Sequence, residues 1–296
     1  MQRSGDEVLA GARTNGPAIR TSDLSFVYFG SDRYALYHVN FEVSPGDFVG
    51  IIGPSQAGKT TLCYALTGLI PHDVVGQIEG KVYVNGIDTA TMQVYELSKQ
   101  YGFVFDNPEY QLSQASVEEE VALGLENRGV DPDEMDNRID EALKLVGLED
   151  LRHRSPFELS GGQEQRLAIA TMLALKPSIL ILDEPTSFLD PRGKEEVYAT
   201  LRSLHAEGLT IVLVDHEVDL MASAVERLFV MAAGQFVVNG APREVFAQID
   251  RMDALGLRVP QSSEVVARIM GVEHVPLTVN EAFDSLTVVL KGKKKN

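Results

Sequence analysis

Residues 48–60 of the chain read FVGIIGPSQAGKT. The first five have the length of a buried strand, and the next eight match the spacing G-x-x-x-x-G-K-[ST] of a phosphate-binding loop. Thr61, Leu62 and Ala65 then begin a helix, whose N-terminus favours an anion. This order of strand, loop and helix predicts a nucleotide site. Its predicted residues are Gly53, Pro54, Ser55, Gln56, Ala57, Gly58, Lys59, Thr60 and Thr61.

Two side chains of this loop have separate predicted tasks. Lys59 is expected to neutralise the β- and γ-phosphates of a nucleoside triphosphate. Thr60 is expected to bind Mg²⁺ through its hydroxyl. The sequence therefore predicts ATP and Mg²⁺ as the ligands of the site.

A second stretch, ILILDE at residues 179–184, places two carboxylates after four apolar residues. Taken alone, this pattern is typical of a strand that ends in solvent. Beside a phosphate-binding loop, Asp183 is expected to hold Mg²⁺ directly or through water. Glu184 is expected to polarise the attacking water, which makes it the predicted catalytic carboxylate.

A third stretch, LSGGQ at residues 159–163, opens a helical pattern marked by Leu167, Ala170 and Leu173. A Ser-Gly-Gly turn at a helix start is either a simple serine cap or a second phosphate site. Its place between the phosphate-binding loop and residues 179–184 favours the phosphate site. The residues predicted to bind nucleotide there are Ser160, Gly161, Gly162 and Gln163.

With EQR at residues 164–166, these motifs resemble the ATP-binding cassette (ABC) ATPases over roughly residues 20–245. The resemblance implies an α/β fold: a P-loop NTPase (RecA-like) core with a mostly parallel sheet, an antiparallel β subdomain and an inserted helical subdomain. In that family two domains pair head to tail, and each ATP lies between the phosphate-binding loop of one and the LSGGQ motif of the other. One copy of each motif implies a homodimer, or a heterodimer with a paralogous ATPase.

The resemblance assigns further residues. Tyr28 matches the aromatic residue that stacks on adenine, although an apolar strand core also accounts for it. His216 matches the switch histidine that contacts the γ-phosphate, so it joins Glu184 as a predicted catalytic residue. Residues 187–190, SFLD, resemble the D-loop that crosses the dimer interface.

Two positions depart from the family pattern. Gln56 stands where glycine is common, and glycine suits a tight turn because it tolerates a positive φ. Gln56 therefore implies a slightly different loop or some strain. Asp106 stands where the family has the Q-loop glutamine, which contacts Mg²⁺ and senses the membrane partner. Aspartate can still bind the metal, but it adds negative charge near the γ-phosphate. We expect Asp106 to reduce ATP hydrolysis until a partner repositions the loop.

The remaining sequence pattern predicts how the chain is divided. Apolar runs at 179–182 and 211–214 indicate buried parallel strands, and Asp131-Pro132 followed by Gly147 delimit a predicted helix. The predicted divisions are a disordered arm at 1–17, the ATP-binding domain at 18–250 with a helical subdomain at about 107–159, and a C-terminal extension at 251–296.

Composition excludes several classes of protein. The formal net charge of -17 disfavours nucleic-acid binding. Cys63 is the one cysteine, so no disulfide can form within the chain. No stretch approaches the roughly 20 apolar residues of a membrane span. These features predict a soluble, cytosolic protein, which a partner must hold if it works at a membrane. With the ABC resemblance, the predicted location is the cytoplasmic face of the membrane, as a peripheral subunit.

A finer resemblance is to energy-coupling factor (ECF) ATPases. It rests on residues 107–112 (NPEYQL), 116–122 (SVEEEVA), 242–246 (PREVF) and 255–260 (LGLRVP). It implies uptake of a vitamin or of cobalt or nickel ions, with a transmembrane scaffold (T) protein and a substrate-binding membrane (S) protein as partners. The alternatives are a conventional ABC importer subunit and a soluble ABC ATPase outside transport. The sequence leaves the substrate and the choice between homodimer and heterodimer open.

Overall fold

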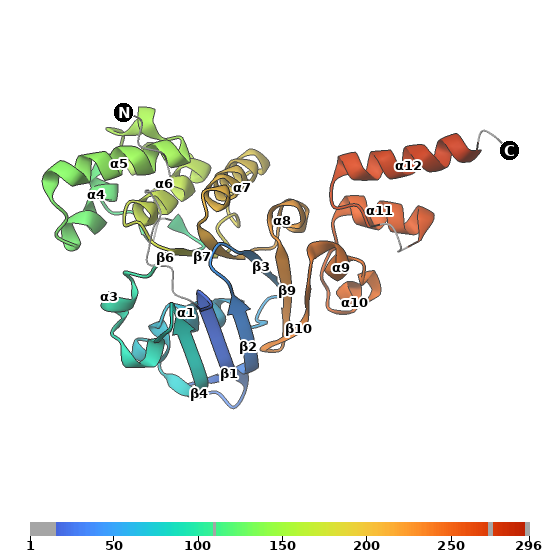
Figure 1. Ribbon diagram of the computed structural model, residues 1–296, viewed down its shortest axis with the longest axis horizontal. Helices are drawn as coiled ribbons and strands as arrows, with labels where there is room; N and C mark the ends of the chain where they lie inside the picture. The colour runs from blue at the N-terminus through green and yellow to red at the C-terminus, as the bar shows by residue number, and fades with distance from the viewer. Residues whose placement is uncertain (1–15, 109–110, 272–274, 294–296) are drawn as a thin grey trace.

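The computed structural model describes residues 16–108, 111–271 and 275–293. It contains two sheets (Figure 1). The strands of the six-stranded sheet are, in spatial order, β10 (Gln235–Gly240), β9 (Arg227–Ala232), β3 (Phe48–Ile52), β8 (Thr210–Val214), β7 (Ile179–Asp183) and β6 (Tyr101–Val104). All neighbouring pairs in it are parallel except β9 with β10. The mostly parallel sheet predicted from the sequence is confirmed.

The central strands are continuous apolar runs because both faces of the sheet are covered. All five residues of β3, of β7 and of β8 are buried. Alternate side chains enter two separate cores: Leu180 and Leu182 lie in one, and Ile179 and Ile181 in the other. The sheet therefore separates a helical layer from a second layer that carries the phosphate-binding loop.

The antiparallel sheet belongs to the second layer. Its strands are, in spatial order, β2 (Tyr34–Val43), β1 (Ile19–Tyr28), β4 (Gly76–Val84) and β5 (Ile87–Asp88). Asn85 and Gly86, with φ of 48° and 79°, form the tight turn between β4 and β5. This confirms the predicted antiparallel β subdomain. Also on this side are α1 (Lys59–Leu66) with the fully buried Cys63, α2 (Leu69–His72) and α3 (Val94–Leu97).

Helices lie on the opposite side of the parallel sheet (Figure 1). Helices α6 (Gly161–Leu173), α7 (Pro191–Ala206) and α8 (Val218–Ala224) pack against its strands, and α4 (Val117–Asn127) and α5 (Pro132–Val146) pack against α6. Helix α5 begins and ends as the sequence predicts, because the Asp131 side chain accepts a hydrogen bond from the backbone of Asp133 and Gly147 closes the helix at φ 66°. Short 3-10 turns cover residues 149–151 and 156–158. The domain boundaries themselves stay predictions, and residues 1–15 of the predicted arm lie outside the described residues.

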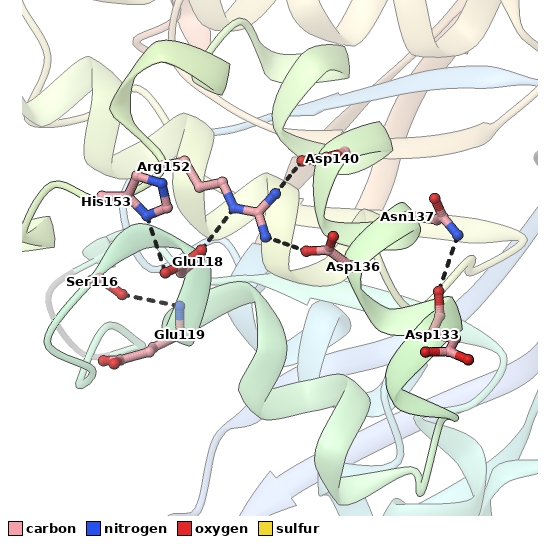
Figure 2. A network of polar contacts seen from close by, with 9 residues as sticks. All are labelled: Ser116, Glu118, Glu119, Asp133, Asp136, Asn137, Asp140, Arg152 and His153. Carbon is pink, nitrogen blue, oxygen red and sulfur yellow. Dashed lines mark hydrogen bonds and ion pairs between the residues drawn. The ribbon is translucent and has the colours of Figure 1, made fainter.

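Arg152 joins three parts of the helical layer (Figure 2). Its guanidinium contacts Glu118 of α4 at 2.7 Å, Asp140 of α5 at 2.5 Å, and Asp136 of α5. The hydrogen bond from Arg152 lowers the pKa of Glu118. Because Arg152 lies shortly before residues 159–163, this ion-pair network holds the segment that leads to LSGGQ against α4 and α5.

We expect Arg152→Ala to lower the free energy of unfolding by about 1–2 kcal/mol, since three carboxylates would then repel one another without a counter-charge. Urea denaturation of the purified protein measures this change. Arg154→Ala is the matched control. Arg154 is half-exposed and pairs with Glu158 alone, so its loss should cost less than about 0.5 kcal/mol. Equal effects of the two variants would contradict the network's role.

Four helices follow the last strand of the six-stranded sheet: α9 (Pro242–Phe246), α10 (Ile249–Ala254), α11 (Gln261–Met270) and α12 (Val279–Lys293). The predicted C-terminal extension at 251–296 takes in most of α10 together with α11 and α12. Figure 1 shows α11 and α12 projecting away from both sheets. Arg243 anchors α12 to α9 through a 2.8 Å ion pair with Glu281. Among the described residues, no helix is both long and apolar enough to cross a bilayer.

Candidate nucleotide site

The phosphate-binding loop connects β3 to α1. Gly58 at its end has φ 105°, and an added Cβ would lie 2.3 Å from the backbone oxygen of Ala35, so only glycine fits there. Gln56 has φ 64°, a left-handed conformation that is unfavourable for a side chain other than glycine. The expected strain at Gln56 is therefore present in the loop.

The Lys59 side chain lies inside this loop. It is 5% exposed, and its Nζ donates to the carbonyl oxygens of Gly53 at 3.0 Å and Pro54 at 3.2 Å. Nζ also lies 3.4 Å from Oε1 of Glu184. This buried ammonium, which loop carbonyls and a carboxylate hold, is ready to exchange these contacts for phosphate oxygens.

Asp183 is the last residue of β7, and its buried carboxylate accepts a hydrogen bond from the Thr60 side chain. Oδ1 of Asp183 has no hydrogen-bond partner among the described residues. Burial raises the pKa of Asp183 to about 6, the charges of Glu184 and Asp106 add to this, and a hydrogen bond from Thr60 opposes it. An unpaired buried carboxylate oxygen beside a hydroxyl fits Mg²⁺, which prefers oxygen ligands and takes few of them from protein.

Glu184 meets the predicted switch histidine. Its Oε1 lies 2.8 Å from Nε2 of His216, and this hydrogen bond is the first cause of a lowered pKa of Glu184. The backbone of Glu184 has φ 50° and donates to the carbonyl of Val214 at 2.8 Å. A left-handed glutamate costs on the order of 1–3 kcal/mol and persists only where its neighbours hold it. The structure thus brings Lys59, Asp183, Glu184 and His216 together, as the sequence predicts.

Tyr28 lies at the other end of the phosphate-binding loop. Its hydroxyl is 2.9 Å from Oγ1 of Thr61, and its ring packs edge-on against Phe26. Phe26 is fully buried, whereas Tyr28 is half-buried. Tyr28 is therefore partly exposed beside the start of α1, close to the phosphate-binding loop. Its stacking on adenine stays a prediction.

The LSGGQ residues form the start of α6. Ser160 Oγ accepts from the backbone of Gln163, and the Gln163 side chain accepts from the backbone of Ser160 at 2.9 Å. Gly162 lies so close to Gly193 of α7 that an added Cβ would be 3.1 Å from its Cα. The serine cap is thus present, and a phosphate bound there stays a prediction. Helices α6 and α1 pack on opposite faces of the parallel sheet.

Comparison with known proteins identifies the family. The family model described as ABC transporter matches residues 36–187. The chain belongs to the ABC transporter family. A protein of Pyrococcus horikoshii, provisionally named an ABC transporter ATP-binding protein, is 44% identical over 93% of this chain and 99% of its own length. An energy-coupling factor transporter ATP-binding protein of Clostridium perfringens is 41% identical over 83% of this chain and 88% of its own.

A solved structure shares the same architecture. CbiO1 of Clostridium perfringens, described as part of the ABC transporter complex CbiONQ, superposes with a TM-score of 0.74 and 30% identity. The match covers 86% of this chain and 99% of that one. The chain is therefore an ABC ATPase, the ATP-binding and ATP-hydrolysing subunit of a transporter.

Thr186 and Asp215 of this ABC ATPase carried no signal in the sequence analysis, and Gln111 entered it only as part of the NPEYQL stretch at residues 107–112. Gln111 accepts from the backbone of Phe105 at 3.0 Å and donates to that of Phe103 at 3.2 Å, which fixes the start of the Q-loop. Asp215 and Thr186 form a buried contact behind His216. An amide at residue 111 and a carboxylate before the switch histidine are the only sequence signs of these contacts.

Asp106 is exposed at the edge of the site. Its Oδ1 accepts from the backbone of Asn107 at 2.9 Å, and its charge contributes to the raised pKa of Asp183. It therefore lies near the predicted metal ligand, as expected for the Q-loop position.

We expect Asp106→Gln to raise the basal ATPase rate about five-fold, which is the effect of removing roughly 1 kcal/mol of repulsion. A phosphate-release assay at saturating MgATP measures it. Asp106→Asn removes the charge without adding reach, so it should give a similar gain. If neither variant changes the basal or the partner-stimulated rate, Asp106 does not restrain hydrolysis.

Proposed function

We propose that this ABC ATPase energises an importer of the ECF type, which takes up a vitamin or a transition-metal ion. The observation that carries the proposal is the 41% identity to an energy-coupling factor transporter ATP-binding protein over 83% of the chain. The likeness to CbiO1, part of the complex CbiONQ, supports the same conclusion. The proposed location is the cytoplasmic face of the membrane, as a peripheral subunit.

The proposed catalytic residues act on ATP in the phosphate-binding loop. Lys59 exchanges its contacts with Gly53 and Pro54 for the β- and γ-phosphates. Thr60, Asp183 and Asp106 are the residues that would hold Mg²⁺, which supplies charge neutralisation for the phosphates. Glu184, with its pKa lowered by His216, stays ionised and accepts a hydrogen bond from the attacking water.

The LSGGQ residues of one chain act on the nucleotide that the partner chain binds. Since α1 and α6 pack on opposite faces of the sheet, Ser160–Gln163 are available to a nucleotide bound by another ATPase domain. Two domains that pair head to tail would each complete the other's site. Closure around two ATP molecules moves the helical layer, and hydrolysis releases the pair again. The second domain is another copy of this chain or a paralogous ATPase.

The C-terminal extension offers a further contact for such a pair. Helices α11 and α12, which project from the rest of the chain (Figure 1), carry exposed large apolar side chains. They are Val265 at 50%, Ile269 at 60%, Val279 at 78%, Phe283 at 69% and Val288 at 72% exposure. Exposed apolar residues gathered in one region are typical of a protein interface. We propose that the extension contributes to ATPase dimerisation, as the ECF assignment implies.

Affinity purification of the tagged protein from detergent-solubilised host membranes tests the proposed function. Mass spectrometry should identify a multi-span T protein together with a small S protein, and the S protein would reveal the substrate class. Recovery of a conventional permease instead would favour the alternative importer type. Recovery from the soluble fraction alone, without a membrane partner, would leave an ATPase outside transport. The Lys59→Ala protein in the same membranes controls for partners that need nucleotide.

A further inference from the structure

A buried carboxylate lies directly behind the two predicted catalytic side chains. Asp215 directly follows β8 and is 1% exposed. Its Oδ1 accepts from the backbone of His216 at 2.6 Å, and both of its oxygens lie within 3.0 Å of the Thr186 hydroxyl. Tyr198 of α7 donates to Oδ2 at 3.2 Å. A carboxylate only accepts hydrogen bonds, so these donors satisfy it in place of water.

These contacts close a ring that begins and ends at Glu184. Glu184 is joined by the chain to Thr186, Thr186 bonds Asp215, and Asp215 holds the backbone of His216. His216 then returns to Glu184 through its 2.8 Å side-chain contact. The left-handed backbone of Glu184 needs such support from its surroundings. Asp215 therefore sets the distance between the Glu184 and His216 side chains, because it holds the backbone of His216 in place.

Helix α7 connects this ring to the D-loop. The helix begins directly after Asp190, the last residue of the D-loop, whose side chain caps it through Gly193. Besides the bond from Tyr198, the Lys194 ammonium lies 2.5 Å from Glu217, next to His216. A movement of the D-loop would thus be transmitted through helix α7 to the residues on either side of His216.

We propose that Asp215 is a positioning residue, with Thr186 and Tyr198 as its anchors, that fixes His216 relative to Glu184 for ATP hydrolysis. Burial raises the pKa of Asp215, and the bonds from Thr186, His216 and Tyr198 oppose that shift, so the same groups that place the carboxylate also stabilise its charge. Asp215 touches neither nucleotide nor water in this scheme. The proposal rests on the roles of Glu184 and His216 in hydrolysis and is independent of the transported substrate.

Thr186→Val and Tyr198→Phe test the proposal because each removes one hydroxyl and keeps the shape of the side chain. We expect each to lower kcat for ATP about ten-fold, with KM for MgATP changed less than two-fold, since a small displacement of catalytic groups slows chemistry without weakening binding. Thr200→Val is the matched control. Thr200 lies on the same helix, nine-tenths buried, and its hydroxyl bonds only the Glu196 carbonyl of α7.

A double-mutant cycle separates positioning from general stability. Asp215→Asn removes the charge and replaces one of the two acceptor oxygens with a donor, which weakens the bond from Tyr198. Tyr198→Phe added to it should therefore lower kcat by much less than the product of the two single effects predicts. Thermal denaturation of each variant reports how much folded protein remains. Unchanged kcat in Thr186→Val and Tyr198→Phe overturns the proposal. So does an equal loss in Thr200→Val, or fully multiplicative effects in the cycle. A failure to recover membrane partners in the affinity purification would contradict the proposed transport function, but not the positioning role of Asp215.

Discussion

Glu184→Gln is expected to lower kcat for ATP hydrolysis at least 100-fold while MgATP still binds. The amide keeps the size of the side chain but cannot take a proton from water. In the native site, the hydrogen bond from His216 keeps the pKa of Glu184 low, so the carboxylate is ionised at neutral pH. Steady-state phosphate release gives the rate, and equilibrium binding of a fluorescent ATP analogue gives the affinity.

The same variant also tests the proposed pairing. If hydrolysis opens a closed pair, Glu184→Gln should remain dimeric in MgATP on size-exclusion chromatography, whereas the native protein returns to its nucleotide-free state. Glu195→Gln is the matched control, because Glu195 is an exposed carboxylate of α7. It should leave both the rate and the oligomeric state unchanged. Normal turnover by Glu184→Gln would mean that another residue activates the water.

Local signals in the sequence determined most of the fold that positions this site. The apolar run 48–52 is a buried strand with the predicted bounds, and Asp131 and Gly147 delimit α5 as expected. Such signals depend on residues a few positions apart, so one sequence contains them in full. The sequence also predicts, for a different reason, that four side chains lie close together: those of Lys59, Asp183, Glu184 and His216. Each follows or ends a parallel strand, and the carboxyl ends of parallel strands meet at one edge of a sheet.

The contacts behind the site were not predictable in this way. Thr186 and Asp215 are 29 residues apart, and Tyr198 reaches Asp215 from a helix. No spacing rule relates these residues, because their meeting depends on how α7 packs against β8. The left-handed backbone of Glu184 is also a result of packing, since intrinsic preference opposes it. Gln56 differs, because it stands where the family commonly has glycine, and this predicted either a different loop or the strain that its φ of 64° shows.

Lys59→Ala is expected to weaken MgATP binding by about 10- to 100-fold. A hydrogen bond from a charged group contributes roughly 1.5–3 kcal/mol, and the variant loses its charged contacts to the β- and γ-phosphates. The ammonium is already removed from water in this structure, where Gly53, Pro54 and Glu184 hold it. Binding ATP therefore exchanges its partners and needs little new desolvation. Titration calorimetry with MgATP measures the affinity directly.

Lys81→Ala is the control for a general loss of positive charge. Lys81 is an exposed residue of β4 whose ammonium pairs with Asp88, and it lies outside the phosphate-binding loop. Its variant should bind MgATP as the native protein does. Undiminished binding by Lys59→Ala would refute the role of Lys59. An equal loss in both variants would assign the effect to net charge, which at -17 already repels an anionic ligand. A loss confined to Lys59→Ala would mean that the loop overcomes this repulsion locally, through one buried ammonium and the amides around it.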